Sequence, residues 1–412
     1  MRHSERVFRR IAALAVAALV LGACAGAGQD GGEGGSGGSA TGGNPATGGQ
    51  TATGGQIATG GSPGTGGGTG GQIVVSTGGT GIAGSAGGGR TGGIGGRSGV
   101  AGRSGAAGST AATGGYTGGG GAPPVPKKFC GNITQRGQIP ANYNKYWDQI
   151  TPENEGKWGS VEGTQGKYNW AALDKIHDYA KQNNIAFKQH NFVWGAQQPG
   201  WIGGLSQANQ KAAVEDWIKQ FCTRYPDTEM IDVLNEPPPH TTPPYMAALG
   251  GAGASGYDWV VTIFKWARQY CPNSILIVND YNIIEQSGDN TRMIDLVTKS
   301  RAAGAPIDAI GAQAHGLTNA SATTTKMYID KLTSSTGLPV YISEFDLNIA
   351  DDTQQKNQFQ SLFTMFWQDA NVHGVTVWGY IEGQTWETNS GLMSSSGTMR
   401  PAMTWLMSFL GR

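Results

Sequence analysis

DVLNEP at residues 232–237 and YISEFD at residues 341–346 are the two stretches that decide the fold of this 412-residue chain. In each, a run of β-branched and apolar residues reaches an acidic side chain, Glu236 in the first and Glu344 in the second. A buried strand that ends in a carboxylate points it out of the mouth of a barrel. Either glutamate alone would be interpreted as a structural residue at a strand end, whereas two can face each other across one substrate bond.

Short apolar runs alternate with longer helical stretches throughout residues 127–412, a region long enough for one large domain. The predicted strands cover residues 129–133, 147–150, 186–192, 230–235, 274–279, 309–313, 339–344 and 374–378. The predicted helices cover residues 141–146, 170–182, 207–224, 257–270, 291–303, 323–334, 353–369 and 402–410. This alternation predicts an α/β fold, the (β/α)8 TIM barrel. An open doubly wound sheet is the weaker alternative, because no glycine-rich phosphate loop follows the first strand.

Polar and aromatic residues gather where the predicted strands end, which is where a (β/α)8 barrel carries its active site. They belong to six different strand ends, a convergence that core packing does not explain. A pair of carboxyls in such a place suits glycoside hydrolysis, in which one acts as acid/base and the other as nucleophile or base. The candidates are Glu153, Asn154, Lys157, Trp158, His190, Trp194, Gln197, Asn235, Glu236, Gln313, His315, Glu344, Trp378 and Trp386.

In combination, the motifs in residues 127–412 resemble glycoside hydrolase family 10, the (β/α)8 endo-β-1,4-xylanases. The matching segments are TPENEGKW (151–158), His190 with Trp194, DVLNEP (232–237), NDYN (279–282), QAH (313–315), ISEFD (342–346) and Trp378-Gly379 with Trp386. The resemblance implies a retaining endo-1,4-β-xylanase without a cofactor, in which Glu236 is the acid/base and Glu344 the nucleophile.

The resemblance also implies roles for the surrounding residues. Asn235 would bind the 2-hydroxyl of the reacting sugar, and His315 would orient Glu344, with Gln313 beside it. The sugars on the non-reducing side of the cleaved bond would be bound by Glu153, Asn154, Lys157, His190, Trp194 and Gln197, with Trp378 and Trp386 as walls of the cleft. The sequence departs from the family at Gly195, where histidine is usual, and at Glu382, where aspartate is usual. The stretch PPPHTTPP at residues 237–244 predicts a stiff loop on the leaving-group side.

Two other functions stay open at this point. One is a related retaining barrel hydrolase that cuts another β-1,4-linked glucan or a mannan, because the Asn-Glu pair is widespread among such barrels. The other is a non-catalytic glycan-binding surface protein on the same fold. The Glu-Asn-x-x-Lys-Trp set of residues 153–158 favours xylan, and the presence of both Glu236 and Glu344 favours an enzyme.

The beginning of the chain predicts export. Residues 1–24 have a basic start and a short apolar run that ends in Leu-Gly-Ala-Cys, which resembles a bacterial lipobox with Cys24 as the lipidated residue. Residues 25–122 consist mainly of Gly, Ser, Thr and Ala, a composition that predicts a disordered linker. We therefore expect a lipid-anchored enzyme at the cell envelope or surface, with release outside the cell as an alternative.

Charge and cysteine content narrow the partners. The 29 basic and 29 acidic residues balance, so the net charge does not favour binding to nucleic acid. We expect a monomer that acts on xylan and xylo-oligosaccharides. Its only expected membrane contact is the lipid at Cys24.

Cys222 and Cys271 each follow a helical stretch in consecutive units, which predicts a disulfide between them. Cys130, in the first strand, is then a buried free thiol. The six histidines lack the spacing of a metal site.

Overall fold

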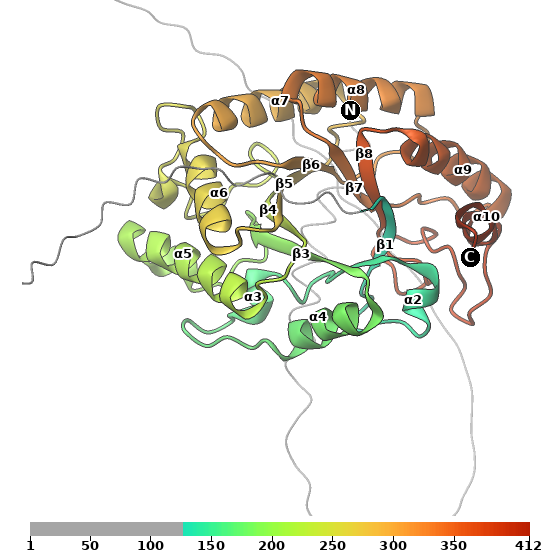
Figure 1. The fold of residues 1–412 in the computed structure, drawn as a ribbon, viewed down its shortest axis with the longest axis horizontal. Helices are drawn as coiled ribbons and strands as arrows, with labels where there is room; N and C mark the ends of the chain where they lie inside the picture. The colour runs from blue at the N-terminus through green and yellow to red at the C-terminus, as the bar shows by residue number, and fades with distance from the viewer. Residues whose placement is uncertain (1–126) are drawn as a thin grey trace, which may run out of the picture. The chain divides into compact units, whose positions relative to one another are not determined.

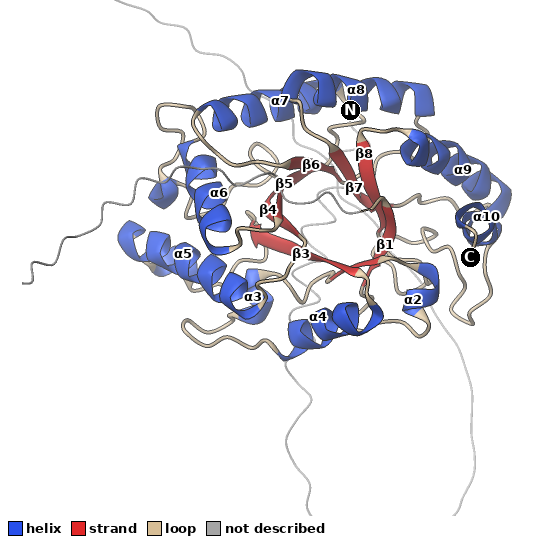
Figure 2. Cartoon of the chain, viewed as in Figure 1, coloured by secondary structure: helices blue, strands red, loops and turns tan. Residues whose placement is uncertain are grey.

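The computed structural model describes residues 127–412 (Figures 1 and 2). The predicted signal with Cys24 and the whole of the predicted glycine-rich linker precede this region and lie outside the described residues. Within residues 127–412, no helix is both long and apolar enough to span a bilayer.

Eight parallel strands form a closed barrel in chain order, and the ring closes where β1 pairs with β8. The strands are β1 (Phe129–Ile133), β2 (Gln149–Thr151), β3 (Ala186–Val193), β4 (Met230–Asn235), β5 (Ile275–Asp280), β6 (Ala309–Ala312), β7 (Val340–Phe345) and β8 (Val372–Val377). Their side chains are almost all buried, because one face of each strand fills the barrel and the other packs beneath the helices. The predicted (β/α)8 barrel is confirmed.

Helices surround the barrel, as Figure 2 shows in blue around the red strands. They are α2 (Tyr143–Tyr146), α3 (Trp158–Val161), α4 (Ala171–Asn183), α5 (Gln207–Arg224), α6 (Asp258–Tyr270), α7 (Ser287–Ala302), α8 (Ala322–Thr336), α9 (Asp352–Gln368) and α10 (Pro401–Leu410), with 3-10 turns η1 (Ile202–Gly204) and η2 (Ala247–Leu249). The sequence did not predict α3, η1 or η2, which are too short to show a helical period.

Trp158, which the sequence placed after the second strand, is the first residue of α3. The ring is 2% exposed and stacks on Trp217 of α5 with 6.2 Å between the ring centroids. Its indole nitrogen donates a hydrogen bond to Glu162. The tryptophan therefore belongs to the layer of aromatic side chains between the barrel and its helices.

The predicted disulfide is present between Cys222 and Cys271, with 5.2 Å between their Cα atoms. It joins the last turn of α5 to the residue that follows α6. Cys130 is the free cysteine of the described region and is buried in β1. Burial raises the pKa of its thiol far above the ordinary value, so it is protonated and unreactive in the folded protein.

Candidate active site

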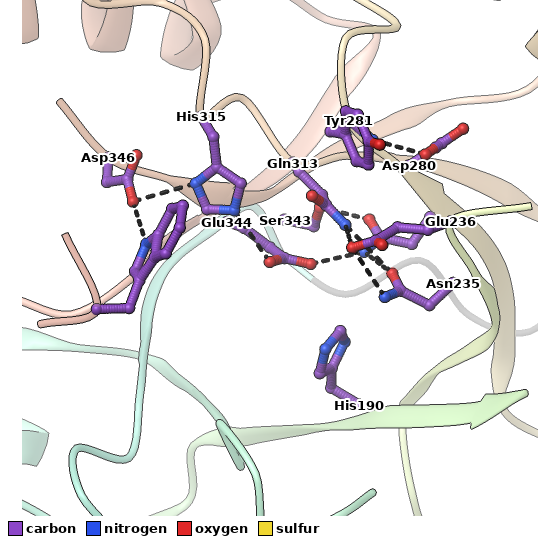
Figure 3. Close-up of polar contacts among 12 residues, drawn as sticks. His190, Asn235, Glu236, Asp280, Tyr281, Gln313, His315, Ser343, Glu344 and Asp346 are labelled. Carbon is purple, nitrogen blue, oxygen red and sulfur yellow. Dashed lines mark hydrogen bonds and ion pairs between the residues drawn. The ribbon is translucent and has the colours of Figure 1, made fainter. Parts of the chain in front are cut away.

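Glu236 and Glu344 lie at the carboxyl ends of β4 and β7 and face a common space at the barrel mouth (Figure 3). Glu344 is 4% exposed, whereas Glu236 is partly exposed just beyond the end of its strand. The backbone of Glu236 has a φ of 49°, in the left-handed region that residues other than glycine seldom occupy. The sequence thus placed both carboxylates correctly at the edge where this fold performs chemistry.

Amide side chains connect the two glutamates. Asn279, at the end of β5, donates hydrogen bonds from Nδ2 to Oε1 of Glu344 at 2.7 Å and to Oδ1 of Asn235 at 2.8 Å. The Oγ of Ser343 donates to Oδ1 of Asn279 at 2.5 Å, which fixes the orientation of the amide. These contacts set the relative position of the two strand ends that carry the carboxylates.

Gln313, which the sequence placed beside His315, contacts the acid/base candidate Glu236. Its Nε2 donates to Oε1 of Glu236 at 3.1 Å and to Oδ1 of Asn235 at 3.3 Å. The second carboxylate oxygen of Glu236 accepts a bond of 2.9 Å from the indole nitrogen of Trp194. Both oxygens of the acid/base candidate are therefore oriented by neutral donors.

Glu344 is held by a charged partner. Nε2 of His315 lies 3.2 Å from Oε2 of Glu344, and Nδ1 of the same ring lies 3.1 Å from Oδ2 of Asp346. Trp386 also donates to that oxygen of Asp346 at 2.6 Å. Figure 3 shows the resulting row of Asp346, His315 and Glu344 along one side of the site. An imidazole between two carboxylates is stabilised as the imidazolium.

These surroundings push the two glutamates toward opposite protonation states. Desolvation raises the pKa of Glu236, and the charge of Glu344 adds to that effect against the hydrogen bonds of Gln313 and Trp194. Burial would also raise the pKa of Glu344, but the hydrogen bond from His315 and nearby positive charges lower it to about 2. Burial opposes the charge on His315, yet Asp346 and Glu344 raise its pKa well above the ordinary value. One protonated and one ionised carboxyl is the pair that glycoside hydrolysis requires.

A second cluster contains most of the residues predicted to bind sugars on the non-reducing side. Lys157 is 7% exposed, and its Nζ donates to Asn154 at 2.9 Å and to Gln197 at 2.7 Å. The same ammonium lies 5.0 Å from the ring centroid of Trp194. Burial raises the pKa of neighbouring Glu153 to about 7, although the charge of Lys157 opposes this. Lys157 is therefore a buried cation of the cleft and not a surface lysine.

His190 projects from β3 toward the glutamates in Figure 3. Its Nδ1 lies 2.9 Å from Oδ2 of Asp232, and Lys188 pairs with the same oxygen at 3.0 Å. Asp232 thus fixes the orientation of the His190 ring. Trp378 borders this space, with its ring centroid 5.3 Å from that of His190, whereas Trp386 is 36% exposed at the outer edge.

Residues 126–408 match glycosyl hydrolase family 10. The chain belongs to this family. It is 48% identical over 281 residues to endo-1,4-beta-xylanase B of Cellvibrio japonicus, a match that covers 68% of this chain and 45% of that protein. It is 26% identical over 294 residues to endo-1,4-beta-xylanase 3 of Hypocrea jecorina, over 69% of this chain and 83% of the relative. The family assignment made from the motifs is confirmed.

Solved structures of family 10 xylanases share the fold. Native xylanase 10B of Thermotoga maritima superposes with a TM-score of 0.62 at 21% identity, over 69% of this chain and 95% of that one. Xylanase 10B of Thermotoga petrophila, solved with xylobiose, gives a TM-score of 0.60 at 20% identity, over 69% and 94% of the two chains. At this identity the likeness extends to the barrel alone.

Sequence reasoning assigned no role to Asp346 or Asn279, although both lie in the motifs that carried the family resemblance. A signal was available for Asp346, because residues two apart in an extended run share a face and Glu344 lies two positions earlier. No comparable signal existed for Asn279, whose partners Asn235 and Glu344 are 44 and 65 residues away in the chain.

Among residues 127–412, no group of three or more His, Cys, Asp or Glu side chains is arranged to hold a metal ion.

Proposed function

We propose that this chain is a retaining endo-1,4-β-xylanase. The observation that carries the proposal is the pair of glutamates with opposed pKa shifts at the mouth of a family 10 barrel. The relatives that it resembles are named as xylanases, and the predicted substrate-binding residues lie around the same space. Because the chain spans 45% of the length of the Cellvibrio relative, the proposal concerns the barrel domain that they share.

In this mechanism, ionised Glu344 attacks the anomeric carbon while Glu236 gives its proton to the oxygen of the departing chain. The glycosidic bond breaks, and an ester forms between the sugar and Glu344. Glu236, now ionised, then takes a proton from water as the water attacks the same carbon and releases Glu344. Two inversions give net retention. His315 keeps the nucleophile ionised, and Asn235 binds the 2-hydroxyl of the reacting sugar in this proposal.

Product analysis on xylan tests the reaction. We expect release of xylo-oligosaccharides, with the β-anomer as the first product by NMR. Hydrolysis of carboxymethylcellulose or mannan in preference to xylan would point to the related hydrolases instead. Absence of turnover on any xylo-oligosaccharide would leave a glycan-binding protein, and an initial α-anomer would rule out double displacement.

The two glutamates can be distinguished by azide rescue. Glu344→Ala should lose nearly all activity on every substrate, because no glycosyl-enzyme can form. Glu236→Ala should retain more activity on an aryl xylobioside with a good leaving group, since that group departs with little protonation. Azide should then rescue its turnover and give a β-glycosyl azide. The reverse pattern would exchange the two roles.

For the location of the enzyme, we propose an exported lipoprotein attached through Cys24, with residues 25–122 as the linker between lipid and barrel. Its support comes from the lipobox-like end of the apolar segment and from the Gly, Ser and Thr composition that follows. We further propose a monomer, with xylan and xylo-oligosaccharides as its partners.

A further inference from the structure

The proline-rich loop of residues 237–244 and the departure at Gly195 meet at one place in the structure. The backbone nitrogen of Gly195 donates to Oγ1 of Thr241 at 3.1 Å. A Cβ atom at position 195 would lie 2.5 Å from the backbone nitrogen of Thr242 and 2.6 Å from Cβ of Thr241. The loop therefore fills the space that a side chain at position 195 would need, so Gly195 and the proline-rich loop form one structural feature.

Thr241 also holds the backbone of Glu236. Its Oγ1 donates to the carbonyl oxygen of Glu236 at 2.7 Å, and its backbone nitrogen donates to the same oxygen at 3.1 Å. On the other side, the nitrogen of Glu236 donates to the carbonyl of Asn279 at 2.9 Å. A non-glycine residue persists at a φ of 49° only where its surroundings impose it, and these three bonds do so.

His240, in the middle of the loop, contacts acidic residues of β5 and α7. Its Nδ1 lies 2.7 Å from Asp280 at the end of β5, and its Nε2 lies 3.0 Å from Asp289 in the first turn of α7. Its ring lies parallel to that of Tyr281, with 3.8 Å between the centroids and 9° between the planes. Arg292 pairs with Asp289 as well, so the contact partner of His240 on α7 is itself held in place.

We propose that residues 237–244 form a brace that fixes Glu236, with Thr241 and His240 as its positioning residues. The brace spans from Gly195 beyond β3 to α7, and its prolines restrict the other conformations open to it. Proton transfer to a leaving oxygen needs the carboxyl within hydrogen-bond reach, so a small displacement of Glu236 lowers the rate. The inference rests on the proposed function, because it assigns the brace to the proton-donating step.

The test compares kcat/KM for aryl xylobiosides that differ only in the acidity of the leaving phenol. Thr241→Val removes the hydroxyl and keeps the branched shape. We expect a loss of about tenfold or more for phenol and of less than about threefold for dinitrophenol, since the latter needs little protonation. Thr241→Ser keeps the hydroxyl and should retain the wild-type dependence. Thr242→Val, with the same change at the exposed neighbour, serves as the matched control.

His240→Phe keeps a ring over Tyr281 and removes both contacts with carboxylates. It should therefore also lower kcat/KM much more for the phenol substrate than for the dinitrophenol substrate. Should either variant fail to fold, Gly195→Ala pushes the loop from its other side and is expected to act alike. Equal losses for all leaving groups, or wild-type rates in folded variants, would overturn the brace. A wild type inactive on every xylobioside would instead refute the proposed function.

Discussion

Glu236 and Glu344 are chemically identical residues, and their neighbours alone give them different protonation states. Neutral donors, Gln313 and Trp194, contact Glu236, so desolvation prevails and its pKa rises. Glu344 instead contacts His315, whose positive charge is maintained by Asp346. The difference between the proposed proton donor and the proposed nucleophile therefore originates in the residues that surround the two carboxyls.

The acid limb of the pH–rate profile should depend on His315. Glu344 must be ionised to react, and its pKa is lowered to about 2, so activity is lost only at very low pH as the carboxyl becomes protonated. His315→Asn removes the positive charge, so the pKa of Glu344 should rise and the acid limb of kcat/KM should move to higher pH. Asp346→Asn should shift the limb in the same direction. An acid limb unchanged in both variants would show that His315 does not control this ionisation.

The alkaline limb should depend on Trp194. Glu236 must be protonated to donate, so kcat/KM falls as pH rises through its raised pKa. The indole hydrogen bond favours the ionised form, so Trp194→Phe should raise that pKa further and move the alkaline limb to higher pH. Trp386→Phe removes an indole bond to Asp346 and leaves Glu236 untouched, which makes it the control. A shift to lower pH in Trp194→Phe would contradict the assignment.

Among the secondary-structure elements, α5 and α6 are joined by the Cys222–Cys271 bond, which closes 49 residues of chain at the outside of the barrel. Such a link acts mainly by limiting the unfolded chain. Replacing both cysteines by alanine should lower the free energy of unfolding by about 2–4 kcal/mol, measured in urea, and leave activity per folded molecule nearly unchanged. A large loss of activity in the folded variant would mean that the bond shapes the cleft.

Thiol counting checks the same bond without mutation. Cys130 is fully buried and its thiol has a raised pKa, so the native domain should resist alkylation and the denatured domain should show one reactive thiol. Three reactive thiols from an oxidatively folded sample would exclude the disulfide.

Elements with a strong local pattern were predictable from the sequence, and those fixed by distant contacts were not. β1, β4 and α5 have the predicted bounds, because short, mainly apolar runs mark the two strands and a long helical period marks the helix. α7 begins at Ser287, four residues before its predicted start. The prediction began too late because Gly288 lowers the local helix propensity. Its first turn is held by the contact between Asp289 and His240, which lies 49 residues earlier in the chain. The contact of Gly195 with Thr241 likewise has no local signature.

For the whole molecule, the chain combines a predicted export segment, a long glycine-rich stretch and a barrel that carries the complete set of candidate catalytic residues. A flexible linker of about 100 residues has a typical end-to-end distance of roughly 50–60 Å. If residues 25–122 are the proposed linker, we expect the barrel to reach insoluble xylan near the envelope while its chemistry stays independent of the proposed anchor. We therefore predict that mutations can abolish attachment to the membrane without affecting catalysis by the barrel.

Cys24→Ala should release the enzyme from the membrane fraction, because the acyl chains have no other attachment point in the lipobox-like sequence. Cys130→Ala is the matched control, since it removes a buried thiol of the barrel and should leave the enzyme in the membrane fraction.

Deletion of residues 25–122 should keep kcat/KM on soluble xylo-oligosaccharides within about twofold, since the linker composition cannot form a packed core. The same deletion should slow hydrolysis of insoluble xylan by whole cells, because the barrel is then confined near the lipid surface. Membrane retention of Cys24→Ala would refute the anchor, and loss of activity on soluble substrates in a folded deletion variant would show that the linker contributes to the active site.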